Sequence, residues 1–363
     1  METLLNIKNL AVFRVDASVV IGLGHVMRCL TVANKLASLG WSVIFICNNL
    51  LGHQSELIKE NGHQVALINS LTKKTNTNIN KDFTTDLDCT EDANQTIDIL
   101  LGQTITLLVV DHYLLDEIWH KKLRPYVKKI LVIDDLANRR YDCDILLDQT
   151  FNRSQKDYIS LVNPGTVTYT GSKFALLREQ FQLNSGAVLK HRLGIKTRDR
   201  ILLMMGGSDP QNYTKKIMVS LLKTEGISIT VLLGNNYLYL TEIAELCQQY
   251  TNITIKQDVK EVADIMLQHD ICIGAAGSAT WERCVCGLPT ILISLADNQN
   301  KILTEMVDFG AAKYLQDITS SSEINHHLDG WRNSTDLYYR SVEKNIEICD
   351  GHGVNRIVGV IGV

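Results

Sequence analysis

The chain has 363 residues, more than one typical domain core needs, so we expect two domains. Its composition, 45% hydrophobic and 21% charged, is that of an ordinary globular protein. The formal net charge of −4 argues against general nucleic-acid binding, which needs a basic face, and no apolar run is long enough for membrane insertion.

The nine cysteines are odd in number, and none of them has zinc-finger spacing. Cys284-Val-Cys286 has no second pair near it in the sequence that would complete a metal site. We therefore expect a reduced, cytoplasmic protein with neither a metal site nor a cofactor. The polar residues near the start, Glu2 and Lys8 among them, do not resemble a signal peptide.

Short β-branched runs alternate with helical patterns in the first half, which indicates β-α-β units and a parallel sheet. We expect strands at 10–15, 42–47, 64–68, 105–110, 130–133 and 144–147. The apolar spacing after His25 predicts a helix that ends at Gly40. The stretch 70–95 is rich in Thr, Asn, Lys and Asp, so we expect a polar surface excursion there rather than a core element.

The pattern restarts after a basic stretch at 184–200, which we interpret as the connection between domains. We expect strands at 200–205, 228–233, 252–255, 271–273 and 290–293, and helices at 209–222, 238–249, 258–268 and 279–286. A polar helical pattern follows from 321 to 351, and such a tail can cross back onto the first domain. The sequence thus predicts an N-terminal domain at 1–190, a C-terminal domain at 191–335 and a helical tail at 336–363.

The first strand leads into a glycine turn, Gly22-Leu23-Gly24, and then into the helix that starts at His25. A helix N-terminus destabilises the imidazolium ion, which keeps a neutral base available near neutral pH. Asp16 is near enough in sequence to orient the ring. A lone histidine here would be a surface or capping residue, but the glycine turn beside it favours a catalytic base.

A second glycine turn, Gly206-Gly207-Ser208, follows a predicted strand and precedes a helix. Unpaired N–H groups in such a turn can bind an anion, and Ser208 adds a hydroxyl donor. The alternative is a tight turn with an Asp or Ser N-cap, which is common in α/β proteins.

A third turn, from Gly277 through Ser278 and Thr280 to Glu282, is the sharper signal. Small residues with two hydroxyls at a helix start form an anion nest, and the Glu282 carboxylate suits a ribose diol. The alternative is a capping box in which Ser278 pairs with Glu282. Three such turns together predict a cleft between two nucleotide-binding domains.

Other polar residues follow predicted strands, where open α/β sheets bind ligands. Asn298 and Gln299 can bind sugar hydroxyls or acetamido groups, although exposed amides are the reading that spacing alone favours. Asp111 and Asp134 are candidates for the site or for loop caps. Arg178 can reach towards a pyrophosphate or form a structural salt bridge.

These motifs together resemble one family. The blocks that carry the resemblance are Arg14-Val-Asp-Ala-Ser18, Ile21–Leu30, Ile133–Ala137, Cys143–Gln149, Phe174–Arg178, Gly206–Asp209 and Gly277–Cys284. Their order is similar to that in the UDP-2,4-diacetamido-2,4,6-trideoxy-β-L-altropyranose hydrolase family of pseudaminic acid biosynthesis, a route to flagellin glycosylation. That family is in turn similar to GT-B glycosyltransferases such as the N-acetylglucosaminyltransferase that completes lipid II.

The resemblance implies an α/β protein of the GT-B fold, with two Rossmann-like domains whose parallel sheets face each other across a cleft. It implies that the C-terminal domain binds UDP, with Glu282 at the ribose and Asn298 and Gln299 beside the sugar nucleotide. The sugar would face Gly22 and Gly24, and His25 would be the base. The implied reaction is hydrolysis of the UDP-sugar to free sugar and UDP, with C–O cleavage and inversion at C1.

Two other functions fit the same residues. A GT-B glycosyltransferase would use His25 to activate an acceptor hydroxyl in place of water. A non-catalytic sugar-nucleotide binding protein would keep Glu282 and the glycine turns but would not need His25. The oligomeric state cannot be read from the sequence.

Overall fold

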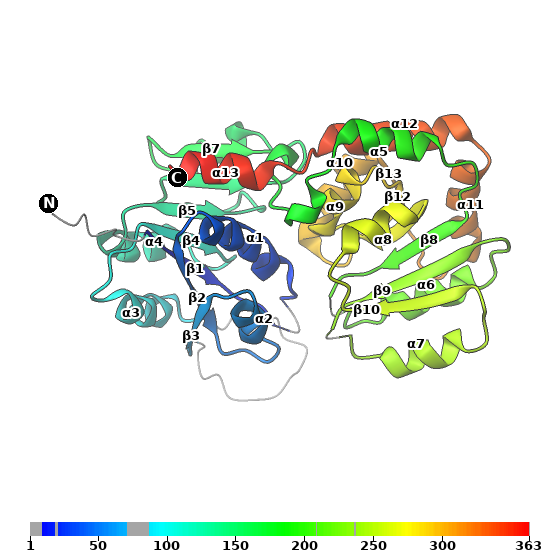
Figure 1. Ribbon diagram of the computed structural model, residues 1–363. Helices are drawn as coiled ribbons and strands as arrows, with labels where there is room; N and C mark the ends of the chain where they lie inside the picture. Colours follow the sequence, from blue (N-terminus) through cyan, green and yellow to red (C-terminus); the bar gives the residue numbers. More distant parts are fainter. Residues whose placement is uncertain (1–8, 19–20, 71–86, 208, 236, 363) are drawn as a thin grey trace, which may run out of the picture. The chain divides into compact units, whose positions relative to one another are not determined.

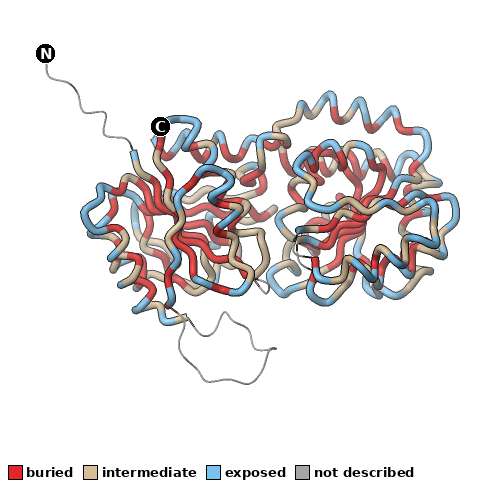
Figure 2. The backbone as a smooth tube through the Cα atoms, turned by 60° about the horizontal axis from the view of Figure 1, so that its bottom comes forward, coloured by how far each residue is buried: buried red, intermediate tan, exposed pale blue. Residues whose placement is uncertain are grey.

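A computed structural model of the chain describes residues 9–18, 21–70, 87–207, 209–235 and 237–362 (Figure 1). The chain forms two compact units. Unit 1 consists of residues 1–176 together with 354–363, and unit 2 consists of residues 177–353. Each unit contains one parallel sheet, and buried strands form the middle of each (Figure 2).

The sheet of unit 1 has seven strands in the order β3-β2-β1-β4-β5-β6-β7. The strands are β1 Leu10–Val15, β2 Ser42–Asn48, β3 Gln64–Ile68, β4 Leu107–Asp111, β5 Ile130–Ile133, β6 Ile145–Asp148 and β7 Val167–Thr170. The strand order reverses between β1 and β4, which pair so that Val15 lies opposite Asp111. Such a switch point, at the carboxyl ends of the strands, is where open α/β sheets bind ligands.

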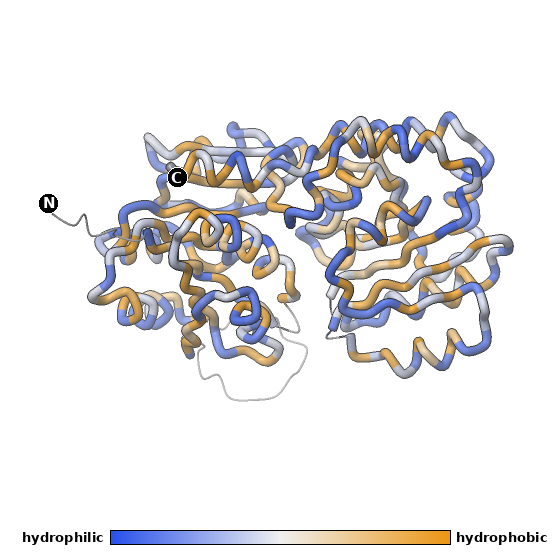
Figure 3. Tube along the Cα trace, in the orientation of Figure 1, coloured by the Kyte–Doolittle hydropathy of each residue, from blue (hydrophilic) through white to orange (hydrophobic). Residues whose placement is uncertain are grey.

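Helices cover both faces of this sheet because alternate residues of each strand point to opposite sides. Ala11, Phe13 and Val15 share a buried cluster with residues of α1 (Gly24–Ser38) and α13 (Gly353–Ile361). Val12 packs instead with α3 (Cys89–Leu100) and α4 (Glu117–Leu123). A short helix, α2, spans Ser55–Glu60. The inner strands β4, β5 and β6 are hydrophobic (Figure 3) and buried at every residue, as a sheet covered on both faces requires, whereas the edge strands β3 and β7 are largely not buried.

The prediction of a polar surface excursion at 70–95 is wrong where the structure describes it. Residues 71–86 lie outside the described part, but α3 begins at Cys89 and buries Asp92 and Ala93 completely. Asp88 caps the helix by accepting hydrogen bonds from the N–H groups of Thr90 and Glu91. A cap followed by apolar residues at helical spacing outweighs the polar composition of the surrounding stretch.

The sheet of unit 2 has six strands in the order β10-β9-β8-β11-β12-β13. They are β8 Arg200–Met204, β9 Ser228–Leu233, β10 Ile253–Gln257, β11 Ile271–Ala275, β12 Thr290–Ile293 and β13 Ala312–Tyr314. The helices are α5 Ser185–Leu193, α6 Tyr213–Leu221, α7 Leu240–Cys247, α8 Val262–Gln268, α9 Ala279–Val285, α10 Asn300–Asp308, α11 Ser321–Arg332 and α12 Thr335–Ile348. Here the order reverses between β8 and β11.

The compact units divide the chain differently from the expected domains 1–190, 191–335 and 336–363. Helix α5 belongs to unit 2, because buried Arg192 donates hydrogen bonds to the carbonyl groups of Met266 and Cys286. The expected tail is shared, since α12 lies in unit 2 and residues 354–363 in unit 1. No helix among the described residues has both the length and the apolar character needed to cross a membrane.

Candidate active site

His25 is the second residue of α1 and pairs with Asp111 at the end of β4. The His25 Nδ1 atom lies 2.6 Å from Asp111 Oδ1, and the His25 side chain is 11% exposed. An ionised carboxylate can only accept, so His25 Nδ1 carries the hydrogen of this contact. Among the described residues, no hydrogen bond occupies Nε2. The contact therefore orients the imidazole so that Nε2 is the ring nitrogen that Asp111 does not engage.

Arg28 holds Asp111 from the other side. Its Nε donates to Asp111 Oδ2 at 2.6 Å and its Nη2 donates to Oδ1 at 2.7 Å. Burial, the largest single cause, would raise the pKa of Asp111, but the charges and hydrogen bonds of Arg28 and His25 together outweigh it and hold that pKa well below its usual value. Asp111 is therefore ionised at neutral pH, as the orientation of His25 requires.

The ring of Tyr113 fixes His25 from a third direction. The two ring centroids are 4.7 Å apart and the ring planes meet at 84°. This edge-to-face contact limits rotation of the imidazole about its side-chain bonds.

Asp16 does not orient His25, contrary to our expectation. Its carboxylate accepts hydrogen bonds from Arg14 Nη1 at 2.6 Å and from the Asn48 backbone N–H at 2.7 Å. The third partner is His112, whose Nε2 lies 3.2 Å from Asp16 Oδ2. Because the sheet brings β4 beside β1, Asp111 reaches His25 while Asp16 ties together the ends of β1, β2 and β4.

The first glycine turn contains a residue with a positive φ angle, which glycine adopts readily. Gly22 has φ +80°, a region that side chains rarely adopt, and its N–H donates to the carbonyl oxygen of Ser18 at 2.9 Å. Gly24 is the first residue of α1, whose N-cap, Leu23, provides no side-chain hydrogen bond. The backbone at the start of α1 thus lacks a side-chain cap.

Asp134 is a loop cap within the described structure. It is fully buried, accepts hydrogen bonds from the N–H groups of Leu136 and Ala137, and accepts another from the Tyr158 hydroxyl at 2.7 Å. These bonds stabilise the loop after β5. Asp134 thus has the role of a loop cap, one of the two roles that the sequence left open for it.

The second glycine turn follows β8 in unit 2. Gly206 has φ +97° and is exposed, whereas Ser208 lies outside the described residues. The N-cap of α6 is Asn212, whose side chain accepts from the N–H of Lys215, so neither Asp209 nor Ser208 is the cap. Asp209 still accepts hydrogen bonds from the N–H groups of Tyr213 and Thr214 in the first turn of α6. An anion at this turn would therefore have to bind the loop N–H groups rather than the start of α6.

The third turn follows β11, the neighbour of β8 in the sheet. Ser278 is the N-cap of α9 but makes no side-chain capping hydrogen bond, so the capping box does not form. Gly277 lies beside Gln299, since a Cβ atom at Gly277 would be 3.7 Å from Gln299 Nε2. Asn298 is exposed on the turn of 3₁₀ helix at Asp297–Gln299.

Glu282 forms an ion pair with Arg178. The distance from Arg178 Nη2 to Glu282 Oε1 is 2.9 Å, and the guanidinium of Arg178 lies over the ring of Phe181. The salt bridge that the sequence left open for Arg178 is thus formed. Within the described structure no hydrogen bond occupies Glu282 Oε2.

Several residues of the two sites were not singled out from the sequence. Arg28 lies three positions after His25 on the same helix face, a spacing that could have indicated it. Gly234 had no such signal: a Cβ atom there would lie 2.2 Å from the carbonyl oxygen of Gly207. Gly234 therefore allows the end of β9 to pack against the glycine turn after β8.

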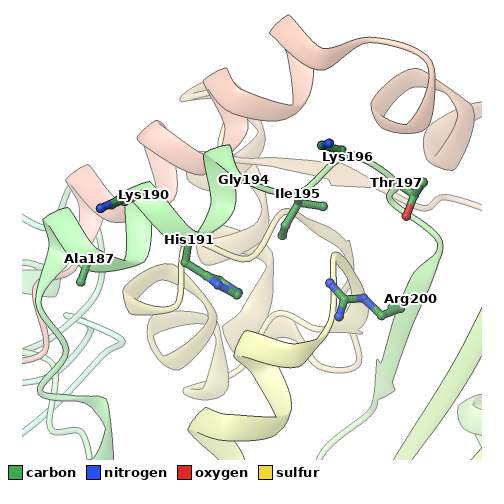
Figure 4. A pocket seen from close by; sticks show the side chains of 8 residues that line it. All are labelled: Ala187, Lys190, His191, Gly194, Ile195, Lys196, Thr197 and Arg200. Carbon is green, nitrogen blue, oxygen red and sulfur yellow. The ribbon is translucent and has the colours of Figure 1, made fainter.

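Unit 2 has a surface pocket formed by α5, the segment after it and the first residue of β8 (Figure 4). Its lining residues are Ala187, Lys190, His191, Gly194, Ile195, Lys196, Thr197 and Arg200. Arg200 begins β8, whereas Gly206 follows its carboxyl end. We assign the candidate site to the carboxyl ends, where the glycine turns are. Among the described residues, no group of three or more His, Cys, Asp or Glu side chains could hold a metal ion.

Comparison with known proteins shows what the chain is similar to. Residues 201–345 match the glycosyltransferase family 28 C-terminal domain. Over 300 residues the chain is 28% identical to the UDP-2,4-diacetamido-2,4,6-trideoxy-β-L-altropyranose hydrolase of Campylobacter jejuni, covering 82% of this chain and 96% of that protein. An uncharacterised protein of Methanocaldococcus jannaschii is 26% identical over 324 residues, which cover 87% of this chain. The match spans only 60% of that relative's length.

The fold is similar to that of solved structures over nearly the whole chain. The crystal structure of Acinetobacter baumannii MurG matches with a TM-score of 0.66 at 14% identity, covering 98% of this chain and 99% of the other. The chain therefore has the GT-B fold, matches the glycosyltransferase family 28 C-terminal domain over residues 201–345, and shows the resemblance to the hydrolase family that its sequence motifs indicated.

Proposed function

We propose that this protein hydrolyses a UDP-linked 2,4-diacetamido-2,4,6-trideoxy sugar, the β-L-altropyranose by resemblance, to the free sugar and UDP. Such a product belongs to the synthesis of a nonulosonic acid such as pseudaminic acid. The match to the family 28 domain, the GT-B fold and the similarity to the named hydrolase support an enzyme that acts on nucleotide sugars. The observation that carries the hydrolytic part is the His25–Asp111 pair.

In this proposal His25 is the general base. Its Nε2 takes a proton from a water molecule as the water oxygen attacks C1 of the sugar. The bond between C1 and the UDP oxygen breaks, and UDP leaves with the electron pair. Asp111 stabilises the imidazolium that forms, and general-base assistance of this kind typically contributes on the order of 10²–10⁴-fold. Attack opposite the leaving group inverts C1.

We assign binding of the nucleotide to unit 2. The loop N–H groups near Gly206, Gly207, Gly277 and Ser278 would bind the diphosphate. Thr280 would add a hydroxyl donor, and Ser208, a candidate from the sequence alone, would add another. This assignment is supported by the family match, which includes both turns.

The nucleoside and the sugar would be bound by the side chains around these turns. Glu282 Oε2 would accept a hydrogen bond from the ribose while Oε1 keeps its ion pair with Arg178. The remaining N–H groups of Arg178 would be available to the diphosphate. Asn298 and Gln299 would contact the sugar nucleotide, and Gly22 and Gly24 would let the sugar approach the backbone of unit 1.

A glycosyltransferase is the second candidate, and the family 28 match favours it. The same His25 would then remove the proton from an acceptor hydroxyl instead of from water. The two candidates differ only in the nucleophile. A measurement of the reaction products can therefore distinguish them, whereas a measurement of nucleotide binding cannot.

The test is to incubate the full chain with a panel of UDP-diacetamido sugars in ¹⁸O-labelled water. Hydrolysis predicts UDP release without an acceptor, with the label in the free sugar. Release that requires an added acceptor would identify a glycosyltransferase, and binding without release would identify a binding protein. Label in UDP would show P–O cleavage and contradict the proposed step.

A His25→Asn variant tests the base itself. We expect kcat to fall on the order of 10²–10⁴-fold while the Kd for UDP stays near that of the wild type. His326→Asn is the matched control, because His326 is an exposed histidine of α11. Near-normal turnover of the His25 variant would exclude this histidine as the base.

A further inference from the structure

Arg283 of α9 is a buried arginine to which the proposed mechanism gives no task. Its side chain is 1% exposed, and Nη2 donates to the carbonyl oxygen of Ala275 at 2.7 Å and to Thr280 Oγ1 at 3.0 Å. In the part of the chain that the structure describes, Nε has no hydrogen-bond partner and no carboxylate forms an ion pair with Arg283. A buried charge with only neutral partners is costly unless an anion balances it.

The other arginines buried to the same degree have balanced charges. Arg14 forms a salt bridge with Asp16. Arg192 donates to carbonyl groups at the end of α8, including that of Met266 at 2.9 Å, where the helix dipole is negative. Arg198 also lacks a carboxylate partner among the described residues, but its guanidinium lies over the rings of Tyr338 and Tyr339. Arg283 has none of these arrangements in the part of the chain that the structure describes, so the partner that balances its charge remains to be explained.

The guanidinium of Arg283 lies where both glycine turns of unit 2 begin. A Cβ atom at Gly274 would be 2.7 Å from Arg283 Nη1 and 3.0 Å from the carbonyl oxygen of Met204. Gly274 and Met204 are paired across β11 and β8. The absence of a side chain at Gly274 therefore leaves room for the guanidinium near the carboxyl ends of β11 and β8. The turns at Gly206 and Gly277 follow these two strand ends.

We propose that Arg283 is a positioning residue for the diphosphate, one whose buried charge balances that of the nucleotide without touching it. This proposal rests on the assignment of nucleotide binding to unit 2. The charge acts strongly because it lies in a region of low dielectric constant. Thr280 Oγ1 accepts from Arg283, which leaves the Thr280 hydroxyl hydrogen available to a phosphate oxygen. The consequence is selectivity for a charged over an uncharged uridine ligand.

The experiment compares the affinities of UDP and uridine for the full chain by calorimetry at low ionic strength. In Arg283→Gln we expect the ratio of UDP affinity to uridine affinity to fall on the order of tenfold. Arg283→Lys keeps the charge, so its ratio should stay within about threefold of the wild type. Arg192→Gln is the matched control: it removes a buried arginine, lowers Tm and leaves the ratio unchanged.

The ratio separates an electrostatic role from a merely structural one. Equal losses of UDP and uridine affinity in Arg283→Gln would overturn the inference. If that variant does not fold, Arg283→Lys decides, because a tenfold fall in its ratio would also overturn the inference and a retained ratio would support it. Wild-type protein that fails to bind UDP would contradict the proposed function itself, whereas UDP binding with an unchanged ratio in Arg283→Gln contradicts this inference alone.

Discussion

Asp111 Oδ1 lies 2.6 Å from His25 Nδ1, and this contact joins residues that are 86 positions apart. The same carboxylate is clamped by two N–H groups of Arg28. The imidazole is therefore oriented by a group that is itself immobilised, which is the arrangement that a general base requires.

Asp111→Asn should lower kcat on the order of 10²–10³-fold in the UDP-sugar assay, because the amide cannot stabilise the imidazolium as a carboxylate does. The variant should also be less stable by about 3–5 kcal/mol, since Arg28 is left buried without its main counter-charge. Steady-state kinetics and urea unfolding measure the two effects. Asp116→Asn, which keeps a residue suited to capping α4, is the control. A folded Asp111→Asn protein with wild-type kcat would contradict this role.

Unit 1 should lose stability in acid because three of its buried aspartates have depressed pKa values. Burial, the largest single cause, would raise the pKa of Asp111, Asp16 and Asp92, but the charges and hydrogen bonds of Arg28 and Arg14, together with those of the neighbouring histidines, outweigh it. A carboxyl whose folded-state pKa is depressed stabilises the fold above its unfolded pKa, about 3.9 for Asp. That stability is lost as pH falls through this value towards the folded pKa.

Urea unfolding between pH 7 and pH 3 measures this dependence. We expect the free energy of unfolding to be nearly constant near neutral pH and to decline below about pH 5. The decline should be shallower in Asp111→Asn, which has lost one of the three groups. Identical acid slopes in the variant and the wild type would count against the contribution of Asp111.

Glu282→Gln tests the proposed ribose contact. We expect UDP affinity to fall about tenfold, the loss typical of a charged hydrogen bond, and the preference for UDP over 2′-deoxy-UDP to shrink with it. Glu305→Gln provides an exchange of the same kind on α10. A Glu282 variant that keeps the full preference for the 2′-hydroxyl would show that this carboxylate does not bind the ribose.

Gly234→Ala should disturb the glycine turn after β8, because the new Cβ atom would lie 2.2 Å from the Gly207 carbonyl oxygen. Overpacking against a backbone costs about 1–3 kcal/mol, and UDP affinity should fall along with Tm. Gly359→Ala is the matched control, since a Cβ atom there has no neighbour within 4 Å and alanine favours the helix. Equal behaviour of the two variants would contradict the proposed packing.

The sequence by itself determined the elements whose signals are local. The predicted strand at 10–15 matches β1, and the predicted strand at 290–293 matches β12, because short, mainly apolar runs identify strands buried on both faces. The glycine at position 22 and the helix after it are likewise local, since a positive φ and an apolar period need no distant partner. Strands β7 and β13 were missed because they are short and incompletely buried.

The tertiary structure alone decided which side chains meet. Asp16 was the natural partner of His25 along the chain, yet the order and register of the sheet bring Asp111 to it instead. Likewise Arg178 reaches Glu282 across 104 positions. The physical reason is that hydrophobic periodicity specifies which face of a strand is buried, whereas the neighbour of that strand depends on the packing of the whole sheet.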